Sequence, residues 1–166
     1  MVVPATDVLS TWAAAQPDAM AVVEDDVSLT FSELNASANR MAAVLLDLGV
    51  QPGDPVVWCG QNGVEVVALV NATRKAGAVS VPLNYRLTPD EAAYVIDDSD
   101  AVVVLFDQEQ ADQLAACPER CPRVRHWVAF RATPDQVPSW AAHLEALAAE
   151  APDVDVAPRP GPSAAR

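Results

Sequence analysis

Two hydrophobic patterns alternate along most of this 166-residue chain. In one, apolar side chains recur every three or four residues, as in a helix with one buried face, and this is clearest between residues 31 and 48. The other consists of short apolar runs rich in β-branched residues, at 55–59, 78–81, 101–106 and 127–130. The run at 101–106 is apolar on both faces, as in a central parallel strand. The alternation predicts an α/β fold with a mostly parallel sheet flanked by helices on both faces.

Polar residues at fixed spacing mark where helices are expected to begin. Segments 30–33 and 88–91 each place a threonine three residues before a glutamate, which is the spacing of a capping box. Asp7 and Asn62 are further N-cap candidates, because their side chains can accept a hydrogen bond from a free amide in the first turn. The other expected elements are a hairpin formed by 21–24 and 28–30, a short helix ending near 116, and a helix from 139 to about 150.

The segment from Arg74 to Leu87 is expected to contain a helix end, a strand and a turn. Its basic residues suit the negative end of the helix dipole, and Gly77 can adopt the left-handed conformation that closes a helix. The strand is expected to end at Pro82, which lacks the backbone donor that a central strand needs. Residues 83–87 are then expected at the carboxyl edge of the sheet, where function usually lies in such folds.

Residues 151–166 differ in composition from the rest of the chain. Prolines and small residues are frequent there, which is typical of a linker rather than of a hydrogen-bonded element. We therefore predict an α/β unit over residues 1–150 and a proline-rich linker over 151–166.

The net charge of −13, with no strong cluster of lysine or arginine, argues against nucleic acid and anionic membrane surfaces as partners. The first twenty residues have no basic start followed by an apolar run, and no apolar run is long enough for a membrane span. We expect a cytoplasmic protein.

Few side chains are spaced for catalysis or metal binding. Cys117 and Cys121 have only His126 nearby, so incidental thiols are favoured over a metal site. His126 and His143 have no serine or cysteine placed by sequence as a nucleophile, and surface positions are favoured for both. The acidic residues of segment 97–100 favour a solvated turn over a cation site. We therefore predict no catalytic and no metal-binding residues in this chain.

Three motifs in order resemble those of a known family. Leu29–Leu34, with the sequence LTFSEL, resembles the first core motif of the adenylate-forming (AMP-binding) superfamily, and Arg74–Asn84 resembles the second. Asn84–Thr88 leading into Glu91 is typical of its fatty acyl-CoA ligase branch. The resemblance covers nearly the whole chain, and it implies the first portion of the large domain of an acyl-CoA synthetase.

This resemblance implies a two-step reaction in the full-length parent, with ATP, Mg²⁺ and CoA as cofactors. A carboxylate would attack ATP to give an acyl-adenylate and pyrophosphate, and the thiol of CoA would then displace AMP. The phosphate loop ending in Pro-Lys-Gly, the later acidic nucleotide-binding motifs and the mobile-domain lysine of that family are not found in this sequence. Gly60 and Gly63 lack the Lys-Ser/Thr of a phosphate-binding Walker loop. We expect this chain to be mainly a scaffold, inactive alone and without a tightly bound cofactor.

One residue in this sequence is a candidate for binding a ligand. In some CoA ligases of this family, the arginine of an Asn-x-Arg-Leu turn reaches a phosphate of CoA, and Arg86 occupies that position here. A guanidinium just before a helix amino terminus would favour a phosphate. The alternative is an ion pair with Asp90 or Glu91, or a solvated side chain.

Two interpretations of function remain open at this stage. In the first interpretation, the chain is the amino-terminal fragment of an AMP-forming fatty acyl-CoA ligase, with the rest of the ligase chain as its partner. Alternatively, it is a non-catalytic α/β interaction or regulatory module, which pairs with itself or with a ligase through an exposed sheet edge or face. A small nucleotide-binding enzyme would share the fold but would need a phosphate-binding loop.

Overall fold

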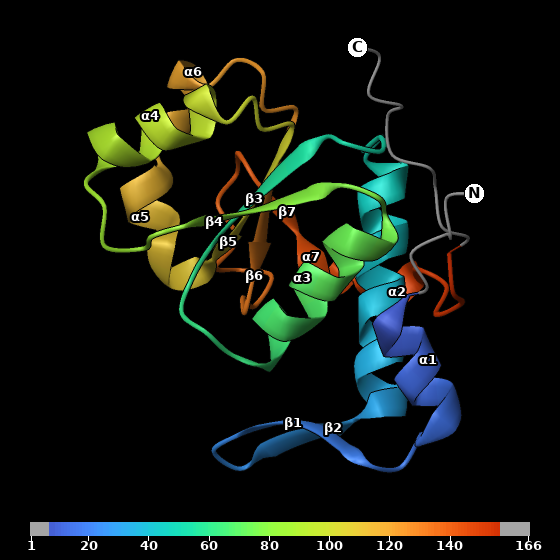
Figure 1. The fold of residues 1–166 in the computed structure, drawn as a ribbon. Coiled ribbons are helices and arrows are strands. Elements are labelled where there is room, and N and C mark those ends of the chain that lie inside the picture. The colour runs from blue at the N-terminus through green and yellow to red at the C-terminus, as the bar shows by residue number, and fades with distance from the viewer. Residues whose placement is uncertain (1–6, 157–166) are drawn as a thin grey trace. The chain divides into compact units, whose positions relative to one another are not determined.

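The computed structural model describes residues 7–156 of the chain (Figure 1). These residues fall into two compact units. The described part of unit 1 comprises residues 7–53, 62–78 and 151–156, and unit 2 comprises residues 54–61 and 79–150. Most of the predicted linker, residues 157–166, lies outside the described residues. Each unit is built from separate stretches of chain, which the backbone joins at four points.

The described part of unit 1 is built from three helices and a two-stranded hairpin. Helix α2 contacts both α1 and α3, and the three helices lie side by side in Figure 1. The antiparallel hairpin turns at Asp25, whose φ of 49° is in the left-handed region that aspartate tolerates in tight turns. The elements are α1 (Val8–Ala15), β1 (Met20–Glu24), β2 (Val27–Thr30), α2 (Phe31–Asp47) and α3 (Val64–Lys75).

The start of α3 differs from the prediction. Its N-cap is Gly63 rather than Asn62, and no cap side chain bonds to the first turn. The amide of Val64 donates instead to Oε2 of Glu24, at 2.9 Å, from the end of β1. The prediction for Asn62 was wrong because a carboxylate distant in sequence satisfies the helix amide. The predicted cap at Asp7 and the capping box of Thr30 and Glu33 are confirmed.

Unit 2 contains a five-stranded sheet in the order β4-β3-β5-β6-β7, and every neighbouring pair is parallel. This confirms the predicted α/β class and its parallel sheet. Strand β5 lies at the centre, and all five of its residues are buried. The elements are β3 (Pro55–Cys59), β4 (Val79–Leu83), α4 (Pro89–Asp98), β5 (Val103–Asp107), a 3₁₀ turn (Gln108–Gln110), α5 (Ala111–Leu114), α6 (Cys117–Arg120), β6 (His126–Phe130), β7 (Ala142–His143) and α7 (Leu144–Glu150).

Two predicted boundaries in unit 2 were wrong. Strand β4 continues through Pro82 to Leu83, because β4 is an edge strand and a proline there removes no bond to a second neighbour. The last helix begins at Leu144 rather than at Ser139. Residues 142–143 pair with β6 as strand β7, so His143 lies in a strand and not in the last helix.

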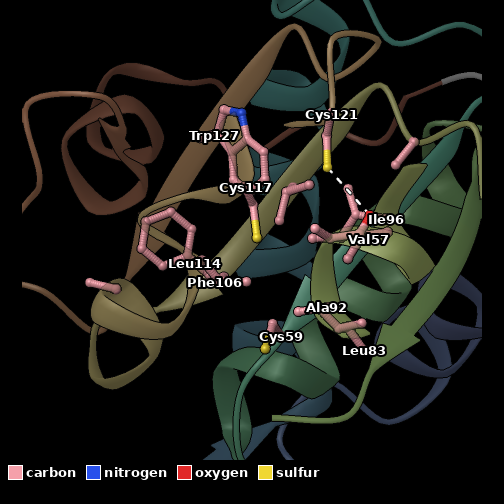
Figure 2. Close-up of a cluster of buried hydrophobic side chains, with 14 of the residues drawn as sticks. Val57, Cys59, Leu83, Ala92, Ile96, Phe106, Leu114, Cys117, Cys121 and Trp127 are labelled. Atoms are coloured by element: carbon pink, nitrogen blue, oxygen red, sulfur yellow. Dashed lines mark hydrogen bonds between the residues drawn. The ribbon is translucent and has the colours of Figure 1, made fainter. Parts of the chain in front are cut away.

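One face of this sheet packs on a hydrophobic cluster that includes residues of α4, α5 and α6 (Figure 2). Phe106 from β5 stacks on Trp140 with ring centroids 5.1 Å apart, and Trp127 from β6 meets the same ring edge-on at 5.8 Å. These ring contacts hold residues 139–141 against the sheet, where the sequence predicted the start of a helix. Cys117 and Cys121 also point into this cluster.

Candidate functional site

The turn after β4 is held in a fixed conformation by hydrogen bonds. Oδ1 of Asn84 accepts from the amide of Arg86 at 3.0 Å, and the amide of Leu87 donates to the carbonyl of Asn84 at 3.2 Å. From α5, Nε2 of Gln113 donates to the carbonyl of Leu87 at 2.5 Å. Tyr85 and Leu87 pack against the hydrophobic cluster of unit 2. The backbone that carries Arg86 is therefore anchored from both sides.

The side chain of Arg86 is exposed at this turn. Its guanidinium carbon lies 5.3 Å from the ring centroid of Tyr85, within the range of a cation–π interaction. Of the two acids predicted as alternative partners, Asp90 pairs with Arg120 at 2.5 Å and Glu91 accepts from Thr88. Among the described residues, Arg86 forms no ion pair, so its charge faces solvent beside the start of α4.

The amino terminus of α4 follows this turn directly. Thr88 and Glu91 form the predicted capping box, with Pro89 at the first helical position. Hydrogen bonds from the backbone amide and the hydroxyl of Thr88 lower the pKa of Glu91. The two acidic residues in the first turn offset part of the positive potential of the helix terminus, so Arg86 supplies the positive charge best placed for an anion here.

A second polar group lies at the carboxyl edge of the same sheet. At the end of β5, Oδ2 of Asp107 accepts from a guanidinium nitrogen of Arg131 at 2.9 Å, and the Asp107 side chain is only 5% exposed. The same nitrogen of Arg131 is 3.3 Å from the carbonyl of Gln61, which follows β3. The amide of Arg131 donates to Oε1 of Glu145 at 2.6 Å. Three strand ends are thus tied together.

The backbone conformation at Arg131 and the close packing at Gly60 restrict which residues these two positions can hold. Arg131 has a φ of 53°, a conformation that few residues other than glycine adopt, and its contacts with Asp107 and Glu145 hold it there. A Cβ atom on Gly60 would lie 3.0 Å from both Cβ of Asp107 and the ring of Phe130. Only glycine fits at position 60 without displacing these atoms.

This second group was not predicted from the sequence. The available signal was an aspartate and an arginine, each directly following a buried strand. Arg86 does not belong to the group, because it follows β4 whereas Arg131 follows β6. Three strand spacings separate β4 from β6, which corresponds to roughly 14 Å.

His143 has structural partners, His126 at the start of β6 is half-buried, and the three thiols are buried. In β7, Nε2 of His143 lies 2.9 Å from the carbonyl of Ala132 and 3.0 Å from a carboxylate oxygen of Glu145. Burial raises the pKa of the Cys59 thiol to about 12 and that of Cys117 to about 11, which makes both weak nucleophiles. Over residues 7–156, no group of three or more histidine, cysteine or acidic side chains could hold a metal ion. No helix in that range is long and apolar enough to cross a membrane.

The sequence matches a family model described as AMP-binding enzyme over residues 9–164. A medium/long-chain-fatty-acid–CoA/3-oxocholest-4-en-26-oate–CoA ligase of Mycobacterium tuberculosis is 38% identical over 111 residues, which cover 67% of this chain and 20% of that protein. The long-chain-fatty-acid–CoA ligase FadD13 of the same organism is 34% identical over 148 residues, covering 86% of this chain and 28% of that protein. The chain therefore spans between a fifth and somewhat over a quarter of these relatives.

Solved structures show the same fold. A Mycobacterium tuberculosis fatty acyl CoA synthetase aligns with a TM-score of 0.77 and 31% identity, over 92% of this chain and 29% of that one. An anthranilate CoA ligase aligns with a TM-score of 0.85 over 94% of this chain and 30% of that one. Its identity of 24% supports the fold alone.

Proposed function

Because the chain belongs to the AMP-binding enzyme family, we propose that it is the amino-terminal part of an AMP-forming fatty acyl-CoA ligase. The match over residues 9–164 carries this proposal, and it confirms the resemblance found in the motifs. Two ligases of fatty acids, similar along 67% and 86% of the chain, favour a fatty acid as the carboxylate.

In the proposed reaction, a carboxylate oxygen attacks the α-phosphorus of ATP and pyrophosphate leaves. The thiolate of CoA then attacks the acyl carbon, forming the thioester and releasing AMP. Family membership implies the use of ATP, Mg²⁺ and CoA by the full-length enzyme. The described residues would contribute a scaffold, since the groups in unit 2 that resemble catalytic side chains are engaged in structural contacts. Asp107 and His143 are the clearest examples.

The experiment that tests the ligase assignment is pyrophosphate release by the full-length protein with ATP, Mg²⁺ and a series of fatty acids. Release that depends on the fatty acid, followed by acyl-CoA formation when CoA is added, is the expected result. An absence of both with every carboxylate tried would contradict the assignment. The 166-residue chain alone is expected to release no pyrophosphate, because catalysis requires preorganised charge around the reacting phosphate.

Within that function, the proposed role of Arg86 is to bind a phosphate group of CoA. Its exposed guanidinium on an anchored turn supports this role, because little motion must be restricted on binding. In the full-length ligase, Arg86→Ala should raise the KM for CoA by about tenfold, as expected for one lost charge-assisted hydrogen bond. The KM for ATP should not change.

Arg74→Ala is a suitable control, since Arg74 is also an exposed arginine but lies on α3 in unit 1. An unchanged KM for CoA in Arg86→Ala would eliminate this role. The ligase assignment would survive that result, because it depends on the formation of acyl-CoA.

A second candidate, a non-catalytic module that pairs through an exposed apolar surface, has one observation in its favour. Met20, Val23 and Val27 in the hairpin are 51–64% exposed. Light scattering after size-exclusion chromatography tests self-association: a concentration-dependent dimer of the 166-residue chain would support the module. A monomer at all concentrations would rule out the proposal that this chain pairs with itself.

A further inference from the structure

The side chain of Lys75 is almost completely buried at the end of α3, with only 2% of it exposed. Its ammonium group donates to Oγ of Ser10 at 2.7 Å and to Oδ1 of Asp155 at 3.1 Å, and it also pairs with the carboxylate of Asp7. An ammonium has three donors, so these three partners satisfy it completely. The sequence suggested only a favourable interaction with the helix dipole at this position.

Asp155 lies near the carboxyl end of the described residues, whereas Asp7 and Ser10 lie near their amino end. Its Oδ1 also accepts from Oγ of Ser10 at 2.8 Å and from Nδ2 of Asn35 at 3.2 Å. Burial alone would raise the pKa of Asp155, but the hydrogen bonds from Ser10 and Lys75, with those from Asn39 and Asn35, outweigh it and lower the pKa to about 2. The carboxylate is therefore ionised at every pH near neutrality.

Two further contacts hold the same terminal segment on α2. Nδ2 of Asn39 donates to the backbone carbonyl of Asp153 at 3.0 Å, and Asn39 is only 2% exposed. The guanidinium of Arg40 pairs with the Asp153 carboxylate at 3.0 Å. Both groups of that pair are about half exposed, so the pair itself contributes little.

Residues 151–156 contain no helix or strand, so their own backbone does not hold them in place. The polar contacts come instead from α1, α2 and α3, and Lys75 is the buried charge on which they converge. We propose that Lys75 and Asp155 form a latch that fixes residues 151–156 on the three helices of unit 1. The latch gives Lys75, within the second family motif, a positioning role that does not depend on the ligase assignment.

Backbone ¹⁵N relaxation of the 166-residue chain tests the latch, because the ¹H–¹⁵N heteronuclear NOE reports picosecond-to-nanosecond motion residue by residue. In the unchanged chain, residues 153–156 should give NOE values close to those of α2. Asp155→Asn should lower the values of these residues to those of a flexible terminus and leave α2 unchanged. Asp155→Glu, which keeps the carboxylate, should restore most of the order.

Lys75→Met should have the same effect as Asp155→Asn, and Arg74→Met is its matched control because Arg74 is exposed. The double variant Lys75→Met with Asp155→Asn should be no more mobile at residues 153–156 than either single variant. Unchanged NOE values in Asp155→Asn would overturn the proposal. Asp155→Asn keeps the test decisive if Lys75→Met fails to fold, because Asp155 has a half-exposed side chain.

Discussion

The ion pair of Asp107 with Arg131 should stabilise unit 2 more than an exposed ion pair does, because its carboxylate is 5% exposed and its guanidinium 23%. Asp107→Asn removes the charge while keeping the side-chain shape. We expect it to lower the free energy of unfolding by about 2–3 kcal/mol, since it weakens a hydrogen-bonded charge pair away from water. Urea denaturation followed by circular dichroism measures this difference.

Asp90→Asn is the control for that measurement. Asp90 also pairs with an arginine, Arg120, but its side chain is 88% exposed. The Asp90→Asn substitution should lower the free energy of unfolding by no more than about 0.5 kcal/mol. Equal effects of the two substitutions would show that burial does not strengthen the pair in unit 2.

Acid should release Asp155 from its partners. The pKa of this carboxyl is about 2 in the folded chain, against an ordinary value of 3.8, so its hydrogen-bond partners stabilise the ionised form. The stabilisation that ionised Asp155 provides is therefore complete at pH values above the ordinary pKa of 3.8, and it is lost as the pH falls through about 2. Heteronuclear NOE values of residues 153–156 should be equal at pH 7 and pH 5 and should fall towards pH 2. The Asp155→Asn variant should show no such transition at these residues, and a wild-type segment that stays fully ordered as the pH falls through 2 would contradict the role of Asp155 in the latch.

At the scale of elements, the capping box of α4 is expected to support the turn that carries Arg86. Thr88→Ala removes the hydroxyl that accepts from the amide of Glu91. A lost N-cap of this kind costs about 1 kcal/mol, which urea denaturation would detect. Thr30→Ala removes the same box from α2 and serves as the comparison. If the box supports the turn, only Thr88→Ala should shift the amide resonances of Tyr85 and Arg86.

Elements whose signals are local were predictable from the sequence. Both capping boxes and the strand β5 depend on residues within a few positions of one another. The start of α3 was not predictable in this way, because the amide of Val64 in its first turn donates to the carboxylate of Glu24, forty positions earlier. Strand β7 forms where a helix was expected, since pairing with β6 overrides the local preference of residues 142–143.

The candidate site divides in the same manner. Arg86 and its turn follow from a short motif, whereas Asp107 and Arg131 are separated by 24 positions and meet only because β5 and β6 are neighbours. Lys75 and Asp155 are 80 positions apart. Contacts at such separation depend on the tertiary arrangement, which periodicity and capping signals do not contain.

At the scale of the whole molecule, each unit is assembled from separate stretches of chain, so a truncation at the carboxyl end can affect one unit more than the other. A chain ending at Glu150 loses Asp153 and Asp155 from unit 1 while unit 2 remains complete. The buried ammonium of Lys75 then keeps Asp7 but loses its second carboxylate. An incompletely paired buried charge destabilises the fold around it.

Native-state hydrogen exchange measures this effect separately in each unit, because amides report local opening. Truncation after Glu150 should lower the protection factors of amides in α2 and α3 by about tenfold, corresponding to about 1.4 kcal/mol. Truncation after Val156 retains every described contact of the latch and should leave those factors unchanged. Amides of β5 and β6 should keep their protection in both chains. A loss of protection that is equal in α3 and β5 would mean that residues 151–156 stabilise the molecule as a whole rather than unit 1 through Lys75.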